Sequence, residues 1–295
     1  MSLVATLISS PAAASLTPEV ADTASRALGA RAPRWLAQGV ACDIALPDGL
    51  EAATAEAALR QAMSGLPLDL AVQPERGRRK KILIADMDST MIDQECIDEL
   101  AAEVGLKEHV SAITRRAMNG EIAFEPALRE RVALLKGLPL AVIDKVIAER
   151  ITLASGGRQL VATMRGHGAW TALVSGGFTL FTGPVAERLS FDEHQSNTLL
   201  ADGDVLAGVV ADPVLGREAK AEALMAIAAR LGVTPADALA VGDGANDLAM
   251  IGLAGMGVAL HAKPTVAAQA RFRVDHGDLT ALLYLQGYSS ADFAS

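Results

Sequence analysis

The stretch that decides the fold is ILIADMDST, at residues 82–90. Its four apolar residues, 82–85, are typical of a short strand buried on both faces at the centre of a parallel sheet. Asp86 and Asp88 follow at the carboxyl end of this strand, where two like charges repel each other. A bound divalent cation would offset that repulsion, whereas a solvated turn is the alternative interpretation. The rest of the chain must decide between the two.

The composition predicts a folded protein with a large core. The chain has 295 residues, 51% hydrophobic and 21% charged, which is enough for one full-sized domain and a smaller one. Its net charge of −9 disfavours nucleic acids and anionic membranes as partners. Cys42 and Cys96 give no disulfide framework, and no apolar run reaches the ~18 residues of a spanning helix. Because the first basic residue is Arg26, a secretory signal is not expected. We expect a cytoplasmic protein.

A small α/β domain is predicted over residues 1–77. Strand-like runs at 3–9, 40–46 and 68–72 alternate there with helical patterns at 18–30 and 51–65. Residues 72–81 (VQPERGRRKK) then concentrate charge around a proline and a glycine. This composition is typical of a linker whose basic side chains are solvated.

A second, larger domain is predicted over residues 78–295. After the strand at 82–85, amphipathic helical patterns fill residues 97–155. Strand candidates return at 169–174, 238–242 and 256–260, with a hairpin predicted at 197–210. The predicted fold class is therefore α/β: an open Rossmann-like parallel sheet, interrupted after its first strand by a helical insertion.

Polar residues follow three of these predicted strands. They are Asp86 and Asp88 after the first, Ser175, Gly176 and Gly177 after the second, and Asp243, Asn246 and Asp247 after the third. Ligands of open α/β sheets bind outside the carboxyl ends of the strands, so the three loops should converge. Lys220 begins a helical stretch just upstream of the third strand and is placed to reach the same crevice.

These elements, in this order, resemble the haloacid dehalogenase superfamily over residues 86–247: DMDST, VSGG, Lys220 and GDGAND. Within it, DMDSTMIDQECIDELA, RERVALLKG, LVSGGFT and GDGANDLAM closely resemble the phosphoserine phosphatases. More faintly, the N-terminal domain resembles the ferredoxin-like amino-acid-sensing domain attached to some of these enzymes. The resemblance implies a Rossmann-like core whose helical insertion is a cap over the site.

The residue types suit phosphoryl transfer. Phosphate monoesters hydrolyse extremely slowly, so their catalyst must stabilise much charge. Asp86, at the end of a rigid strand, is the predicted nucleophile, which would form an aspartyl-phosphate. Asp88 is the predicted acid for the leaving alkoxide and then the base that activates water, and nearby anions should raise its pKa. A dehalogenase expels halide, which needs no proton, so Asp88 favours phosphatase chemistry.

The resemblance also implies a Mg²⁺ ion. Asp86 and Asp243 would supply side-chain oxygens and Asp88 its backbone carbonyl, which are the oxygen ligands that Mg²⁺ prefers. Asp247 is expected to orient ligands or waters around the ion.

A phosphate cradle is expected beside this ion. Ser175 and the amides of Gly176 and Gly177 suit a phosphate group, because glycine permits close backbone approach. Lys220 can neutralise both the nucleophile and the phosphate, and Asn246 is expected to bind the substrate.

Substrate choice is assigned to the cap. By resemblance, Glu95 holds the substrate ammonium, Arg131 its carboxylate, and Phe124 supplies an apolar wall. From the residues alone, Glu95 and Arg131 would be interpreted as solvated helix charges. The resemblance implies hydrolysis of O-phospho-L-serine, the last step of phosphorylated serine biosynthesis.

There are three alternative interpretations of the function. In the first, the enzyme is a phosphatase or phosphotransferase that acts on another small phosphorylated amino acid or alcohol. A response-regulator receiver also accepts phosphate on an aspartate at a strand end, but the helical insertion and Asp88 argue against this interpretation. An amino-acid sensor with a degenerate enzyme is disfavoured by the complete motif set. The oligomeric state is open, with a homodimer as one alternative.

Overall fold

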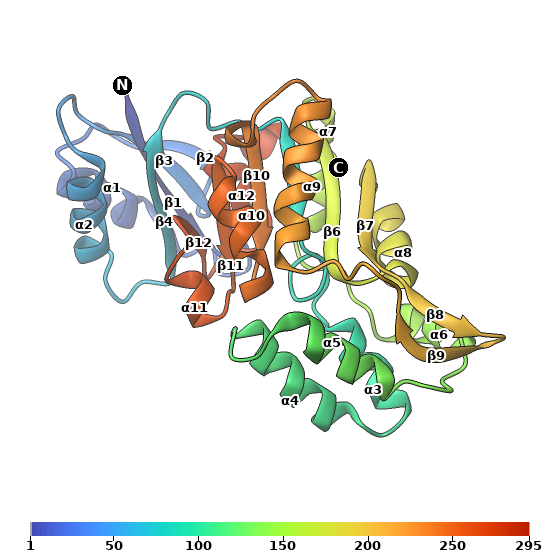
Figure 1. The fold of residues 1–295 in the computed structure, drawn as a ribbon. Coiled ribbons are helices and arrows are strands. Elements are labelled where there is room, and N and C mark those ends of the chain that lie inside the picture. Colours follow the sequence, from blue (N-terminus) through green and yellow to red (C-terminus); the bar gives the residue numbers. More distant parts are fainter. Residues whose placement is uncertain (1, 295) are drawn as a thin grey trace.

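The computed structural model describes residues 2–294. Figure 1 shows an N-terminal unit (blue), a parallel sheet flanked by helices, and a helical cap (green) beyond one end of that sheet. Within the described residues, no helix combines the length and the apolar character needed to cross a membrane.

The N-terminal unit has the element order of a ferredoxin-like fold. Its elements are β1 (Leu3–Ser9), α1 (Pro18–Ala27), β2 (Arg34–Ala37), β3 (Ala41–Ala45), α2 (Ala52–Ala62) and β4 (Leu68–Pro74). The four strands form an antiparallel sheet in the order β2-β3-β1-β4, as expected for this topology. Apolar residues of α1 and α2 pack on one face of the sheet. The prediction missed β2, a short edge strand with only one buried residue.

A six-stranded parallel sheet forms the core of the larger unit, in the order β12-β11-β10-β5-β6-β7. Its strands are β5 (Ile82–Ala85), β6 (Trp170–Phe178), β7 (Glu193–Asn197), β10 (Ala238–Gly242), β11 (Met256–Leu260) and β12 (Phe272–Val274). The helices outside the cap are α7 (Gly157–Gly166), α8 (Thr179–Leu189), α9 (Arg217–Arg230), α10 (Leu248–Leu253), α11 (Pro264–Ala267) and α12 (Ala281–Leu285). The predicted α/β fold class is confirmed; the edge strands β7 and β12 were missed.

The burial of β5 explains its uninterrupted apolar sequence. Ile82 and Ile84 point into a cluster with α9 and α10, whereas Leu83 and Ala85 point into a cluster with α7, α8 and α12. Because both faces are covered, a polar residue at any of the four positions would be buried. The strand therefore holds the residues that follow it rigidly in place.

The cap consists of α3 (Cys96–Glu103), α4 (Lys107–Met118), α5 (Phe124–Ala133) and α6 (Ala141–Glu149). These helices lie within the predicted insertion, and α3, α4 and α5 lie beyond the carboxyl ends of the strands (Figure 1). The predicted hairpin is present as β8 (Leu199–Asp202) and β9 (Val205–Val210). It hydrogen-bonds to residues 137–140 of the cap.

The prediction that residues 72–81 form a linker with solvated basic side chains was wrong in one respect. Strand β4 continues to Pro74, and Arg78 is only 7% exposed. Its guanidinium binds Asp43 of β3 at 2.5 Å and lies against Gly287, where any side chain would collide with it. A buried guanidinium is tolerated here because a buried carboxylate neutralises it. The segment therefore joins the two units through a specific contact.

Candidate active site

The site is built around Asp86, directly after β5. The amide of Asp86 donates to the carbonyl of Val241, which extends the pairing with β10 by one residue. One carboxylate oxygen of Asp86 accepts from the Met87 amide at 2.8 Å and lies 2.7 Å from Lys220 Nζ. The carboxylate is thus held on a rigid strand end beside a fixed cation.

Lys220 joins two of the predicted site residues. It lies in the first turn of α9, is 2% exposed, and contacts Asp247 at 2.6 Å as well as Asp86 at 2.7 Å. Burial by itself lowers the pKa of Lys220, but the charges of Asp247 and Asp86 outweigh it and hold the pKa above its usual value. The ammonium is therefore a permanent positive charge.

Asp88 lies in a different environment from Asp86. Its carboxylate accepts from the Cys96 amide, at the start of α3, at 3.0 Å. Burial, with a contribution from Asp86, raises the pKa of Asp88 to about 7, although the Cys96 hydrogen bond opposes the shift. A Cβ at Gly177 would lie 2.8 Å from Asp88 Oδ2, so a larger residue there would displace the Asp88 carboxylate. The anions predicted to raise this pKa do so, but burial is the larger cause.

The loop after β10 carries the other predicted acids. Asp247 is completely buried, and one of its oxygens accepts from the amides of Asp243 at 3.1 Å and Gly244 at 3.0 Å. Its other oxygen accepts from Lys220. Asp247 therefore holds the loop in shape. Asp243 accepts from Lys263 Nζ at 2.8 Å, a contact that the sequence analysis did not anticipate.

An acidic cluster at the carboxyl ends of β5 and β10 fits a divalent cation. Carboxylate oxygens of Asp86, Asp243 and Asp247 lie within 4.8 Å of one another, and all three residues are buried. Burial is the largest cause that raises the pKa of Asp243 to about 7 and that of Asp247 to about 8. A cation would relieve this cost, and an all-oxygen donor set suits Mg²⁺ better than softer metals.

The residues after the second predicted strand have an extended backbone. Strand β6 runs on to Phe178, with an irregularity in its pairing with β7 between Val174 and Phe178, so Ser175, Gly176 and Gly177 belong to the strand. The Gly177 amide donates to Ser175 Oγ at 2.9 Å. The predicted end of the strand at residue 174 was four residues too early, because the strand continues past the irregularity to Phe178.

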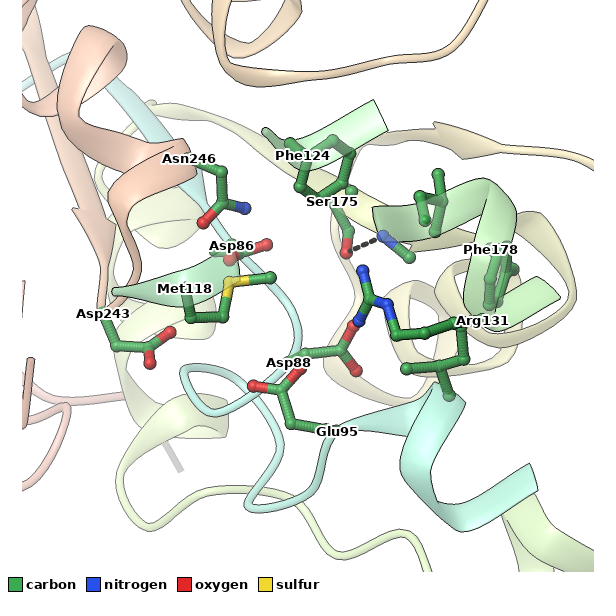
Figure 2. A pocket seen from close by; sticks show the side chains of 14 residues that line it. Asp86, Asp88, Glu95, Met118, Phe124, Arg131, Ser175, Phe178, Asp243 and Asn246 are labelled. Atoms are coloured by element: carbon green, nitrogen blue, oxygen red, sulfur yellow. Dashed lines mark hydrogen bonds between the residues drawn. The ribbon is translucent and has the colours of Figure 1, made fainter. Parts of the chain in front are cut away.

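The two charged cap residues are brought to the same pocket. Glu95 precedes α3 and accepts from Ser89 Oγ at 2.8 Å. Burial, then the charge of Asp88, raises the pKa of Glu95 to about 8. Arg131 of α5 is 2% exposed and donates to Ala127 O and Thr114 Oγ1, both at 2.9 Å. In Figure 2 its guanidinium points toward the carboxylates of Asp88 and Glu95. Arg131 is therefore no solvated helix charge.

The pocket is lined by Phe124 and by further apolar residues that the sequence did not indicate. Phe124 lies against Gly176, where a Cβ would come within 2.7 Å of its ring. Further apolar lining comes from Ile97, Met118, Leu128 and Phe178. Ile97, Met118 and Leu128 occupy ordinary core positions of amphipathic helices and Phe178 is the last residue of β6, so no sequence pattern distinguishes them as pocket residues. The Asn246 Oδ1 atom is buried without a hydrogen-bond partner among the described residues, which leaves an acceptor free in the pocket.

The open space in this pocket is about 30 Å³. Small-molecule sites commonly measure about 300–1,000 Å³, so the cap is closed and must move for a substrate to enter. Phe124 and Asn246 also line a wider neighbouring cavity of about 560 Å³, beside the start of α9. They separate the inner pocket from that outer cavity.

Residues 83–252 match the family described as haloacid dehalogenase-like hydrolase. The chain belongs to this family. Members generally use a divalent metal ion, which the acidic cluster fits. The predicted resemblance to phosphoserine phosphatases is confirmed as well. This hydrolase is a phosphatase of the family.

Three similar proteins illustrate the relationship. A phosphoserine phosphatase from Polaromonas sp. is 42% identical over 226 residues, covering 75% of this hydrolase and 96% of the relative. A solved haloacid dehalogenase family hydrolase from Salmonella enterica superposes with a TM-score of 0.84 at 29% identity, covering 96% of this chain and 98% of that one. A phosphoserine phosphatase solved as an analogue of its phospho-aspartyl intermediate has a TM-score of 0.67 at 39% identity, covering 70% and 98%.

Proposed function

We propose that this hydrolase releases L-serine and phosphate from O-phospho-L-serine, with Mg²⁺ as its cofactor. The observation that carries the proposal is that Glu95 and the buried Arg131 both line the pocket of the two aspartates that follow β5. A carboxylate and a guanidinium in so small a pocket would neutralise the ammonium and the carboxylate of an amino acid. The phosphoserine phosphatase names of similar proteins support the same substrate.

In the proposed first step, an oxygen of Asp86 attacks phosphorus while the bond from phosphorus to the serine oxygen breaks. The product on the enzyme is an aspartyl-phosphate, which divides one difficult displacement into two. The contact of Lys220 with Asp86 at 2.7 Å supports this role, because the ammonium orients the nucleophile and lowers its repulsion from the phosphate.

Asp88 would move the protons in both steps. A carboxyl group with a pKa of about 7 is largely protonated below neutral pH and can donate to the departing serine oxygen. The resulting carboxylate then takes a proton from water as that water attacks the aspartyl-phosphate, which releases phosphate and restores Asp86. The Cys96 amide keeps the Asp88 side chain oriented throughout.

Mg²⁺ would be held by the side chains of Asp86 and Asp243 and by the backbone carbonyl of Asp88. When bound, it supplies positive charge next to the phosphate oxygens. Asp247 would support the site from behind, because its oxygens already accept from Lys220 and two loop amides.

The remaining groups would bind the substrate. Ser175 and Asn246 would contact the phosphate, together with the backbone at Gly176 and Gly177, and Phe124 would cover the serine part. We also infer that residues 1–77 and 78–295 are separate domains. The reaction would be the last step of phosphorylated serine biosynthesis, in the cytoplasm.

The test is phosphate release from a panel of substrates, with and without Mg²⁺. The panel contains O-phospho-L-serine, O-phospho-L-threonine, phosphoethanolamine and glycerol phosphate. The proposal expects Mg²⁺-dependent release with phosphoserine far ahead of the others. If another ester led the panel, the enzyme would instead serve that phosphorylated amino acid or alcohol.

A further inference from the structure

A carboxylate of the N-terminal unit holds a loop of the catalytic unit. Asp69 belongs to β4 and is 5% exposed. It accepts from three consecutive amides that follow β12: Asp275 at 2.7 Å, His276 at 3.1 Å and Gly277 at 2.7 Å. Successive amides that converge on one anion form a specific anion-binding concavity. Loop 275–277 is therefore shaped around a group from the other unit.

The same loop supports the segment after β11. The carbonyl of Gly277 accepts from His261 Nε2 at 2.8 Å, and since a carbonyl can only accept, this nitrogen carries the proton. The His261 amide donates to Val274 O at 2.8 Å. His261 has a φ of 44°, in the left-handed region that residues other than glycine enter at a cost. Its two hydrogen bonds hold this backbone.

Two residues later, Lys263 reaches the acidic cluster. Its amide donates to the carbonyl of Asp243 at 3.0 Å, and its Nζ contacts a carboxylate oxygen of Asp243 at 2.8 Å. Lys263 thus fixes both the backbone and the side chain of Asp243. Hydrogen bonds connect Asp69 to loop 275–277 and that loop to His261, and the backbone of residues 261–263 connects His261 to Lys263.

We propose that Asp69 is a positioning residue for the metal site: by holding loop 275–277 it keeps Lys263 on Asp243 and so orients that carboxylate for Mg²⁺. The inference rests on the proposed function, in which Asp243 is a metal ligand. Residues that orient metal ligands typically change metal affinity by about 10–100-fold when replaced. Asp69 acts at a greater distance, so we expect a smaller effect.

The test variant is Asp69→Asn, which keeps the size of the side chain. Its amide nitrogen would face a backbone N–H, so the asparagine cannot accept from all three amides. We expect the Mg²⁺ concentration at half-maximal thermal stabilisation to rise by about 3–10-fold. The half-activating Mg²⁺ concentration for phosphoserine hydrolysis should rise in parallel, while kcat recovers at saturating Mg²⁺.

Gln73→Met is the matched control. Gln73 is also on β4 and donates across the same interface to Leu285 O at 2.7 Å, and among the described hydrogen bonds none joins its side chain to loop 275–277. Its replacement should lower Tm and leave the Mg²⁺ midpoint unchanged. An equal midpoint shift in both variants would mean that any weakening of the interface disturbs the site, which would overturn the specific role of Asp69.

A double-mutant comparison tests the route. If Asp69 acts through Lys263, Asp69→Asn should have no effect on the Mg²⁺ midpoint in a Lys263→Met background. An unchanged effect in that background, or an unaltered midpoint in Asp69→Asn alone, would overturn the inference. Because thermal stabilisation reports metal binding without turnover, wild-type protein that binds Mg²⁺ but ignores phosphoserine would refute the proposed substrate and leave this inference standing.

Discussion

Replacing Arg131 with methionine separates recognition of the substrate from stability of the cap. Methionine roughly fills the space of the aliphatic part of the arginine side chain, so the replacement leaves little cavity. In the protein Arg131 is buried beside Glu95 and Asp88, and loss of one partner of a desolvated charge pair typically costs about 2–5 kcal/mol. We therefore expect kcat/KM for phosphoserine to fall roughly thirtyfold to several thousandfold.

The assay compares two substrates that differ by one carboxylate. Phosphoethanolamine carries the phosphate and the ammonium of phosphoserine but has no carboxylate. Its kcat/KM should change little in Arg131→Met, because the wild-type guanidinium has no partner on this substrate. Arg129 lies on the same helix, is exposed, and pairs with Glu125, so Arg129→Met is the control and should leave both substrates unaffected.

Two outcomes would refute the reasoning. If both substrates lost the same factor, Arg131 would act only by joining α5 to α4 through Thr114. If neither lost activity, the guanidinium would not touch the substrate. In either case the choice of phosphoserine over other esters would lose its main physical support.

Four further predictions concern the same pocket. Glu95→Gln should reduce kcat/KM for phosphoserine, and spare 3-phosphohydroxypropionate, which lacks the ammonium; an equal loss would contradict the assignment. Asp86→Asn should abolish turnover while circular dichroism stays unchanged, and acid-quenched wild type should carry labelled phosphate on Asp86 and on no serine. Asp88→Asn should slow phosphorylation of the enzyme by phosphoserine far more than by an aryl phosphate, whose leaving group needs no proton; equal slowing would exclude it as the acid. Burial raises the pKa of Asp88 and Asp243 to about 7 and of Glu95 and Asp247 to about 8. These folded-state pKa values exceed the unfolded ones, so metal-free protein should lose stability as pH rises from about 4 to 8 and Mg²⁺ should stabilise it most at the upper end; a Tm that rose across this range would contradict the shifts.

Most of the fold could be predicted from local sequence. Residues 82–85 are apolar because both faces of β5 are covered, and such complete burial leaves an unmistakable pattern. The missed strands β2, β7 and β12 are edge strands. Few positions of β2 and β7 are buried, so their alternation is weak, and β12 alternates over only three residues. Their pairing is set by the neighbouring strand rather than by their own residues.

The candidate site was predictable only where residue type and strand ends coincide. Asp86, Asp88 and Asp243 follow buried strands, and the structure brings all three to one pocket. Lys263 and Asp69 have no comparable sequence pattern. The partner of Lys263 lies 20 residues away in sequence, and the partners of Asp69 lie more than 200 residues away. A charged side chain that is buried by distant elements looks the same in the sequence as a solvated one. Contacts of this kind require the fold.

The charge of the closed pocket explains why a cation belongs there. Asp86, Asp88, Glu95, Asp243 and Asp247 surround it, against the cations of Lys220, Arg131 and Lys263. If all were ionised, the carboxylates would exceed the cations by two, and an incoming phosphate would add more negative charge. Burial raises the pKa of four of these acids, which favours their protonated forms. A divalent cation would favour the ionised carboxylate of Asp243, while Asp88, which contacts the start of the cap through the Cys96 amide, can keep the one proton that the leaving group requires.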